Sequence, residues 1–235
     1  MQPTPPILQS AGATHDVPDR AQTASAADAG VQRVLRNTYA LLSMTLLFSA
    51  GIAAASVALQ WQAPGLAMTL VGVFGLLFAV HKLKNSAWAI AAVFALTGFM
   101  GWTLGPLLAR TLALPGGGEI VTMALGATGA TFLALSAWAL RSKRDFSVMG
   151  GLLFAGMVIA LLAGLAAVFL EIPALGLAVS AMVALLAAGA ILFETHRIVS
   201  GGETNYVLAT VGLYVSIFNL FTSLLQLFGV GGGDD

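Results

Sequence analysis

The residues best suited to chemistry lie where one long apolar run ends and the next begins. Glu194 follows the apolar run 185–193 and is itself followed by His196 and Arg197. A carboxylate at a membrane edge can pair with a neighbouring arginine, can respond to pH if it turns into the protein, or can be solvated by headgroup water. The helical phase leaves these alternatives open. Glu194 is therefore the candidate for pH sensing and the one candidate ligand for a metal ion.

A second set of polar residues follows one face of the last apolar run, 206–228. At 100° per residue its members fall within about 80° of one another; they are Asn205, Gly212, Ser216, Asn219, Ser223 and Gln226. A polar stripe of this length is costly against lipid, so it must face other helices or water. It predicts that this helix is central, either as a hydrogen-bonded packing seam or as the lining of a polar cavity. Ser216 and Asn219 are the candidate polar-core residues.

Catalytic and cofactor chemistry find no support in the residue types. The chain has no cysteine, and its histidines, His15, His81 and His196, lack metal-ligand spacing. Ser136 lacks the flanking glycines of a nucleophile elbow. The predicted spans also lack the Asp pair or Ser/His pair of an intramembrane protease. We expect a protein that is not an enzyme and that carries no cofactor.

Composition indicates the elements that position these residues. Of 235 residues, 58% are hydrophobic and 9% are charged, against roughly a quarter charged in a soluble domain. A membrane core needs about 20 helical residues per crossing. The sequence predicts an all-α integral membrane protein, a seven-helix bundle with spans near 38–60, 65–81, 87–109, 119–140, 147–170, 174–193 and 206–228.

The segments outside these spans are short, except at the N-terminus. Residues 1–36 are rich in proline and small polar residues and have little apolar surface, which predicts a disordered tail. Residues 37–229 form the predicted transmembrane domain, and residues 230–235 form a short C-terminal tail. The net charge of zero argues against nucleic acid as a partner.

The basic residues predict the orientation of the chain in the membrane. If the N-terminal tail is cytoplasmic, one basic residue, Arg110, lies outside. The other nine lie inside; they are Arg20, Arg33, Arg36, Lys82, Lys84, Arg141, Lys143, Arg144 and Arg197. The bias predicts a cytoplasmic N-terminus and, with an odd number of spans, a periplasmic C-terminus.

Small residues spaced four apart recur in several spans, which lets helix backbones approach closely. They are Gly101 and Gly105, then Gly156, Ala160 and Gly164, then Ser180, Ala184 and Ala188. These ridges fit either packing within the bundle, which an Ala- and Gly-rich chain favours, or a homodimer face.

The run from Ile191 to Tyr206 resembles the signature of the Bax inhibitor family of membrane proteins. Its most specific element is Gly201-Gly202-Glu203-Thr204-Asn205-Tyr206. The stretches 213–221, 34–43 and 97–106 are also similar to the family, and more particularly to its bacterial YccA branch. The resemblance covers residues 33–229 and implies seven helices with the last one central, in the bacterial inner membrane, with a cytoplasmic N-terminus.

The resemblance implies two functions. In the YccA branch, the protein modulates the membrane-bound protease FtsH, which engages the N-terminal tail, and proteolysis of other membrane proteins is slowed. Other family members are pH-sensitive calcium leaks that use two acidic residues, whose positions here hold Glu194 and Ser216. Since calcium prefers about six to eight oxygen ligands with several charges among them, the Ser places the leak second. A structural scaffold without a regulatory role stays open as a third class.

Overall fold

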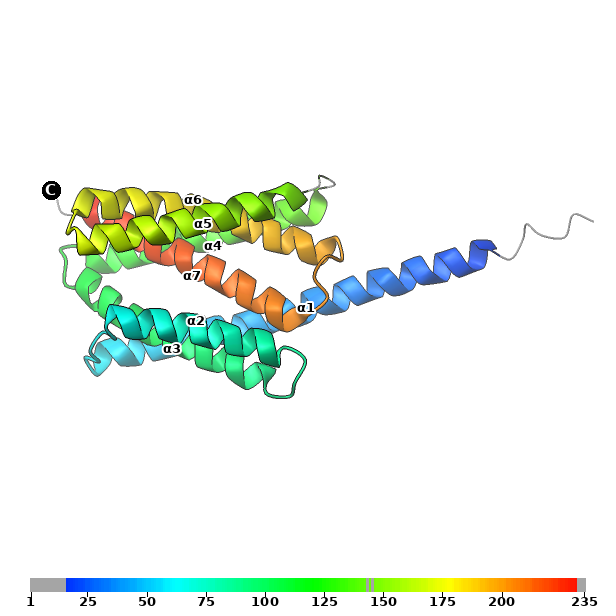
Figure 1. The fold of residues 1–235 in the computed structure, drawn as a ribbon, viewed down its shortest axis with the longest axis horizontal. Helices are drawn as coiled ribbons and strands as arrows, with labels where there is room; N and C mark the ends of the chain where they lie inside the picture. The colour runs from blue at the N-terminus through cyan, green and yellow to red at the C-terminus, as the bar shows by residue number, and fades with distance from the viewer. Residues whose placement is uncertain (1–15, 143, 145, 232–235) are drawn as a thin grey trace, which may run out of the picture.

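The computed structural model describes residues 16–142, 144 and 146–231, and within this part of the chain it is all-helical (Figure 1). All seven expected spans are confirmed as helices long and apolar enough to cross a membrane. Their bounds are α1 Asp16–Ala58, α2 Leu66–Leu83, α3 Ala89–Leu112, α4 Gly117–Arg141, α5 Ser147–Phe169, α6 Pro173–Val199 and α7 Tyr206–Gly231.

The outward surface of the bundle is apolar. Val71 of α2, Phe154 of α5 and Leu185 of α6 are 74%, 74% and 77% exposed. Large apolar side chains exposed on several helices are unusual in a soluble monomer and fit contact with lipid. The fold is therefore that of an integral membrane protein.

The first helix begins much earlier than the sequence predicts. It starts at Asp16, so residues 16–36 are helical where an unfolded chain was expected. Low apolar content argues against a packed core, but alanine is the best helix former, and five alanines lie between Ala21 and Ala29. Pro18 stands in the first turn, where its missing N–H costs no hydrogen bond. Residues 1–15 and 232–235 of the expected tails lie outside the described residues.

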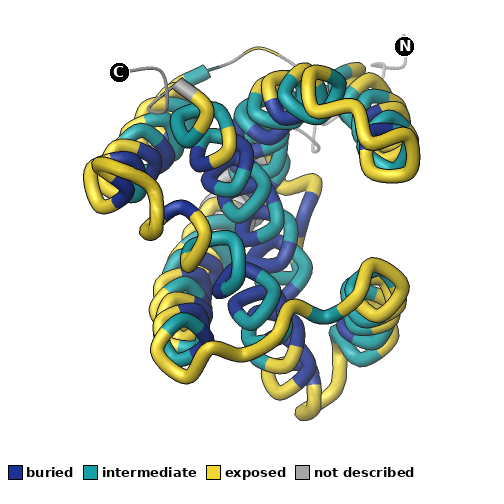
Figure 2. The backbone as a smooth tube through the Cα atoms, turned by 90° about the vertical axis from the view of Figure 1, so that its left-hand side faces the viewer, coloured by how far each residue is buried: buried dark blue, intermediate teal, exposed yellow. Residues whose placement is uncertain are grey.

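Helix α7 is the centre of the bundle, as its polar stripe predicts. In its most apolar stretch 61% of the residues are buried, against 6–39% for the other helices. It lies against α1, α2, α3, α4 and α6. Figure 2 shows the dark-blue, buried stretches gathered toward the middle of the bundle and the exposed ones around the outside.

The other six helices form two groups of three around α7. In the first group α3 lies between α1 and α2, and in the second α6 lies between α4 and α5. The groups touch each other where α1 meets α6 and where α3 meets α4. Within the described chain α5 contacts α6 alone, and α2 contacts α3 and, slightly, α7. Helices α2 and α5 are therefore the least supported members of the bundle.

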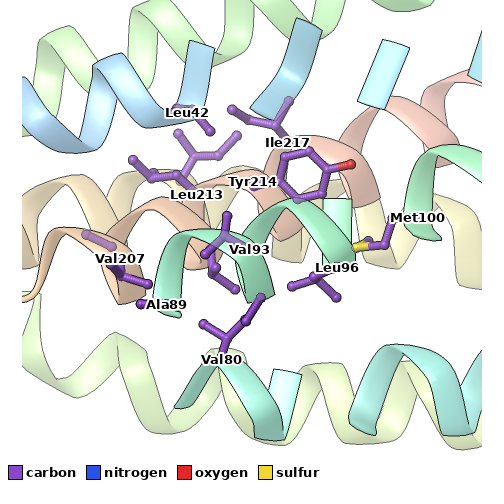
Figure 3. Close-up of a cluster of buried hydrophobic side chains, with 14 of the residues drawn as sticks. Leu42, Val80, Ala89, Val93, Leu96, Met100, Val207, Leu213, Tyr214 and Ile217 are labelled. Carbon is purple, nitrogen blue, oxygen red and sulfur yellow. The ribbon is translucent and has the colours of Figure 1, made fainter. Parts of the chain in front are cut away.

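The main core cluster joins α7 to the first group (Figure 3). Leu42, Val93 and Leu96 pack with Leu213 and Tyr214, and all five are nearly inaccessible. The Tyr214 hydroxyl lies 2.5 Å from the Ser49 hydroxyl and donates to the Thr97 carbonyl at 3.3 Å. One tyrosine thus connects α7 to both α1 and α3.

The ridges of small residues face other helices of the same bundle. A Cβ added at Gly101 would lie 2.5 Å from the backbone oxygen of Ser49 in α1, and one at Gly156 would lie 2.6 Å from Leu186 of α6. The Ser180 hydroxyl donates to the side-chain oxygen of Gln226 at 2.7 Å. These contacts favour packing within the bundle for the ridges, while a homodimer stays a prediction.

Candidate functional site

Glu194 lies near the end of α6 with its side chain turned toward α7. A Cβ added at Gly212 would be 2.9 Å from the Glu194 carboxyl carbon and 3.2 Å from both of its oxygens. The Glu194 side chain is 18% exposed. The Glu194 side chain is thus turned inward, and the absence of a side chain at position 212 leaves room for its carboxyl group.

Arg197 stands between two carboxylates. Its Nη1 is 3.6 Å from Glu194 Oε2, one helical turn away, and its Nη2 donates to Glu203 Oε2 at 2.7 Å. The arginine side chain is 40% exposed and that of Glu203 is 9% exposed. A short charge-assisted bond to a buried carboxylate is stronger than a bond between neutral groups. Glu203 is therefore the primary partner of Arg197, and Glu194 is the secondary one.

The Gly201–Tyr206 motif forms the connection between α6 and α7. Gly201 adopts a φ of 75°, which glycine tolerates and which turns the chain after α6. The Glu203 N–H donates to the Arg197 carbonyl at 3.0 Å, and Glu203 Oε1 accepts the Asn205 N–H at 2.9 Å. The two oxygens of one buried carboxylate thus bridge the end of α6 and the beginning of α7. Gly202 and Thr204 are exposed beside it.

Asn205 uses both ends of its side-chain amide. Its Oδ1 accepts the N–H groups of Val207 and Leu208 at 3.0 and 3.3 Å, which makes it the N-cap of α7. Its Nδ2 donates to the Lys84 carbonyl at 3.1 Å and to Asn85 Oδ1 at 3.0 Å, both in the loop between α2 and α3. The motif therefore ties the α2–α3 loop to the α6–α7 connection. We call the group formed by Arg197, Glu203, Asn205, Lys84 and Asn85 the loop clamp.

The sequence does not reveal that the α2–α3 loop takes part in the loop clamp. Lys84 and Asn85 lie between two predicted spans, and they are 121 and 120 positions away from Asn205 in the sequence. An asparagine directly before an apolar helical run is itself a sequence signal for a helix N-cap, and Asn205 has this position before α7.

Ser216 and Asn219 lie about one and two helical turns beyond Gly212 along α7. The Ser216 hydroxyl donates to the Gly212 carbonyl of its own helix at 2.9 Å. Asn219 lines a groove between α2 and α5. Within the described residues the structure brings Glu194 together with Arg197 and Glu203, and no group of three or more His, Cys, Asp or Glu residues could hold a metal ion there. The roles of Glu194, Ser216 and Asn219 stay predictions.

Comparison with known proteins places this arrangement among relatives. Residues 31–233 match the family model described as inhibitor of apoptosis-promoting Bax1. The chain is 50% identical over 202 residues to the modulator of FtsH protease YccA of Escherichia coli K12, covering 86% of this chain and 92% of that protein. It is 48% identical to an uncharacterized protein of Pseudomonas aeruginosa, and the alignment covers 87% of this chain and 92% of that protein. It is 45% identical to an uncharacterized membrane protein of Vibrio cholerae, and the alignment covers 86% of this chain and 92% of that protein.

Proposed function

This chain belongs to the Bax inhibitor family, and we propose that it is a bacterial inner-membrane regulator that binds the ATP-dependent protease FtsH and slows proteolysis of membrane proteins. The observation that carries the proposal is the 50% identity to a relative named modulator of FtsH protease, in an alignment that covers 92% of that relative. A second relative, from Escherichia coli O6:H1, is named an inner membrane protein. The seven apolar helices agree with that location.

The N-terminal segment supports a specific way of binding the protease. Figure 1 shows the blue part of α1 projecting well beyond the rest of the bundle. Packing against the core cluster begins at Val34 and Leu35, while residues 28–30 are exposed. The stretch from Asp16 to Arg33 measures about 27 Å at 1.5 Å per residue. Most of a helix's stability in a protein comes from its tertiary packing, and α1 packs against the core cluster from Val34 onward. An ATPase that pulls on the N-terminus should therefore meet its main resistance at the bundle.

The bundle behind this segment supports the inhibitory half of the proposal. Extraction must break the central packing of α7, and the loop clamp holds two segments distant in sequence, the α2–α3 loop and the α6–α7 connection, together at one end. A substrate that is easily engaged and slowly extracted occupies the protease and competes with others. We propose this slow competition as the mechanism, with the N-terminus in the cytoplasm.

The experiment measures FtsH degradation of a second membrane protein in proteoliposomes. Three forms of the regulator are compared: the intact chain, a chain that lacks residues 2–30, and a chain in which residues 2–30 are replaced by a Gly/Ser segment of equal length. We expect the deletion to abolish the slowing. If the slowing persists after the deletion, the tail is not the point of engagement. If the chain with the Gly/Ser segment still slows degradation, the protease needs only the length of the tail. If it does not, the protease needs the sequence of the tail.

A calcium leak is the alternative function, and the geometry around Glu194 bears on it. Its carboxylate shares Arg197 with Glu203, so a bound cation would compete with a guanidinium. The position of the second acid is held by Ser216, whose hydroxyl is bonded to its own helix. Calcium flux into vesicles that disappears in Glu194→Gln would favour the leak over the protease regulator.

A further inference from the structure

A groove runs along the bundle between α2 and α5, the two least supported helices. Its volume is about 550 Å³. Its walls are α2 from Leu66 to Leu77 and α5 from Phe154 to Val168, and its floor includes Val215 and Asn219 of α7. Figure 1 shows α7 passing between the α2–α3 pair and the α5–α6 pair, so the groove opens sideways, where lipid surrounds the protein.

The groove spans part of the membrane thickness, which limits what can fill it. It begins at Leu66, the first residue of α2, and beside Val168, near the last residue of α5. The floor residues Met100 and Asn219 lie midway along α3 and α7. At 1.5 Å per residue the α2 wall is about 17 Å long and the α5 wall is about 21 Å long. One leaflet of a membrane core of roughly 30 Å is about 15 Å deep. Both walls are nearer to the depth of one leaflet than to the full core, which a partner's transmembrane helix would have to cross.

The side chains that line the groove favour an apolar occupant. Two of its eighteen residues, Thr69 and Asn219, carry polar side chains. The Thr69 hydroxyl already donates to the Pro64 carbonyl at 3.3 Å. The remaining lining is aliphatic, aromatic or methionine with one glycine, Gly164. We propose that this groove binds one acyl chain of a phospholipid from the leaflet at the α2 N-terminal end. This site goes beyond the proposed regulation of a protease and does not depend on it.

The bound chain has a structural consequence for the bundle. Within the described residues α2 and α5 do not contact each other, and the two groups of three helices meet elsewhere. Dispersion contacts are lost outright where a wall has no partner atoms. A lipid chain seated on Val215 supplies those partners to both groups and holds α2 and α5 in place.

The test counts phospholipids that stay bound during native mass spectrometry in mild detergent. The double variant Val158→Trp/Leu161→Trp fills the groove from α5, since both residues line it. The matched control is Ile159→Trp/Leu162→Trp, two neighbours on the same helix that are 59% and 61% exposed and lie outside the lining. We expect one phospholipid on the wild type and on the control, and its loss from the groove variant. Retention by the groove variant, or equal loss from the control, overturns the proposal.

A substitution at the floor provides an independent measurement. Asn219→Leu replaces the polar end of the groove with an apolar side chain of similar size. An acyl chain should then be held more tightly and survive a higher collision energy. Weaker retention would show that the ligand uses the amide and would contradict an acyl chain. A protein adduct on the wild type, lost from the groove variant, would contradict it equally by identifying a partner chain as the occupant.

Discussion

Glu194 of α6 and Gly212 of α7 lie in contact across the central helix interface. The carboxyl carbon of Glu194 would be 2.9 Å from a Cβ at position 212, which is shorter than any relaxed contact between such atoms. The contact explains why a charged side chain can turn inward at the end of α6. It also links the α6 carboxylate to the helix that forms the centre of the bundle.

This contact predicts a coupling between the two positions. Gly212→Ala should destabilise the protein by about 1 kcal/mol or more, because an added methyl group forces neighbouring side chains to move. In a Glu194→Ala background the same change should cost much less, since the carboxylate is absent. The measurement is a double-mutant cycle on unfolding in detergent. Additive effects of the two substitutions would contradict the contact.

A glycine at the α1–α3 interface should be more sensitive. Gly101→Ala brings a Cβ to within 2.5 Å of the Ser49 backbone oxygen, which cannot swing away as a side chain can. We expect a loss of about 1–3 kcal/mol. The control is Gly75→Ala in α2, where no atom lies within 4 Å of the added Cβ. Equal thermal stabilities of the two variants would be inconsistent with close α1–α3 packing.

Two substitutions at Asn205 separate the two contributions of this residue to the loop clamp, the cap of α7 and the bonds to the α2–α3 loop. Asn205→Ala removes both the cap of α7 and the bonds to the α2–α3 loop, and the cap alone is worth about 1 kcal/mol. Asn205→Asp keeps an oxygen for the cap but loses the donor to the Lys84 carbonyl. Asp should therefore be less destabilising than Ala. Both variants should speed hydrogen exchange in the α2–α3 loop, and unchanged exchange there would mean that the clamp does not hold this loop.

The Arg197–Glu203 pair should matter more than its exposed arginine suggests. Arg197→Gln leaves a buried carboxylate without its charged partner, a loss of about 1–3 kcal/mol. Adding Glu203→Gln should restore part of the stability, because the unpaired charge is gone. Arg141→Gln, at an exposed residue of α4, is the control and should be nearly neutral. If Arg141→Gln costs as much, the effect reflects net charge rather than the pair.

Orientation is directly testable because the chain contains no cysteine. Gln62 in the α1–α2 connection and Ser86 in the α2–α3 connection are both exposed. With a cytoplasmic N-terminus, a membrane-impermeant thiol reagent added outside should label Gln62→Cys and leave Ser86→Cys unlabelled. The reverse pattern would invert the topology.

Hydrophobic length and the polar stripe were enough to predict seven helices and a central α7, because both properties are local to one element. The small-residue ridges predicted close packing for the same reason. The loop clamp could not be predicted, because the fold brings Asn205 and Lys84 together and the residues around each of them give no sign of the contact. The helical start of α1 could not be predicted from apolar surface, because its alanines favour a helix through their intrinsic propensity rather than through burial.

The groove and the direction of Glu194 also depend on tertiary structure. Each helix of the groove is an ordinary apolar span, and the opening exists because α2 and α5 do not meet. Glu194 turns inward because α7 presents a glycine at that height. Such features follow from which helices are neighbours, and periodicity within one helix does not determine that.

The most direct test of protease binding through the N-terminal segment is co-purification of FtsH from membranes with the regulator as bait. The intact chain is compared with the chain that lacks residues 2–30, both at matched expression and with thermal stability measured to show that the bundle is intact. The protease should be recovered with the intact chain and lost with the deleted one. Equal recovery with both would contradict engagement through the N-terminal segment, and recovery with neither would contradict binding to the protease.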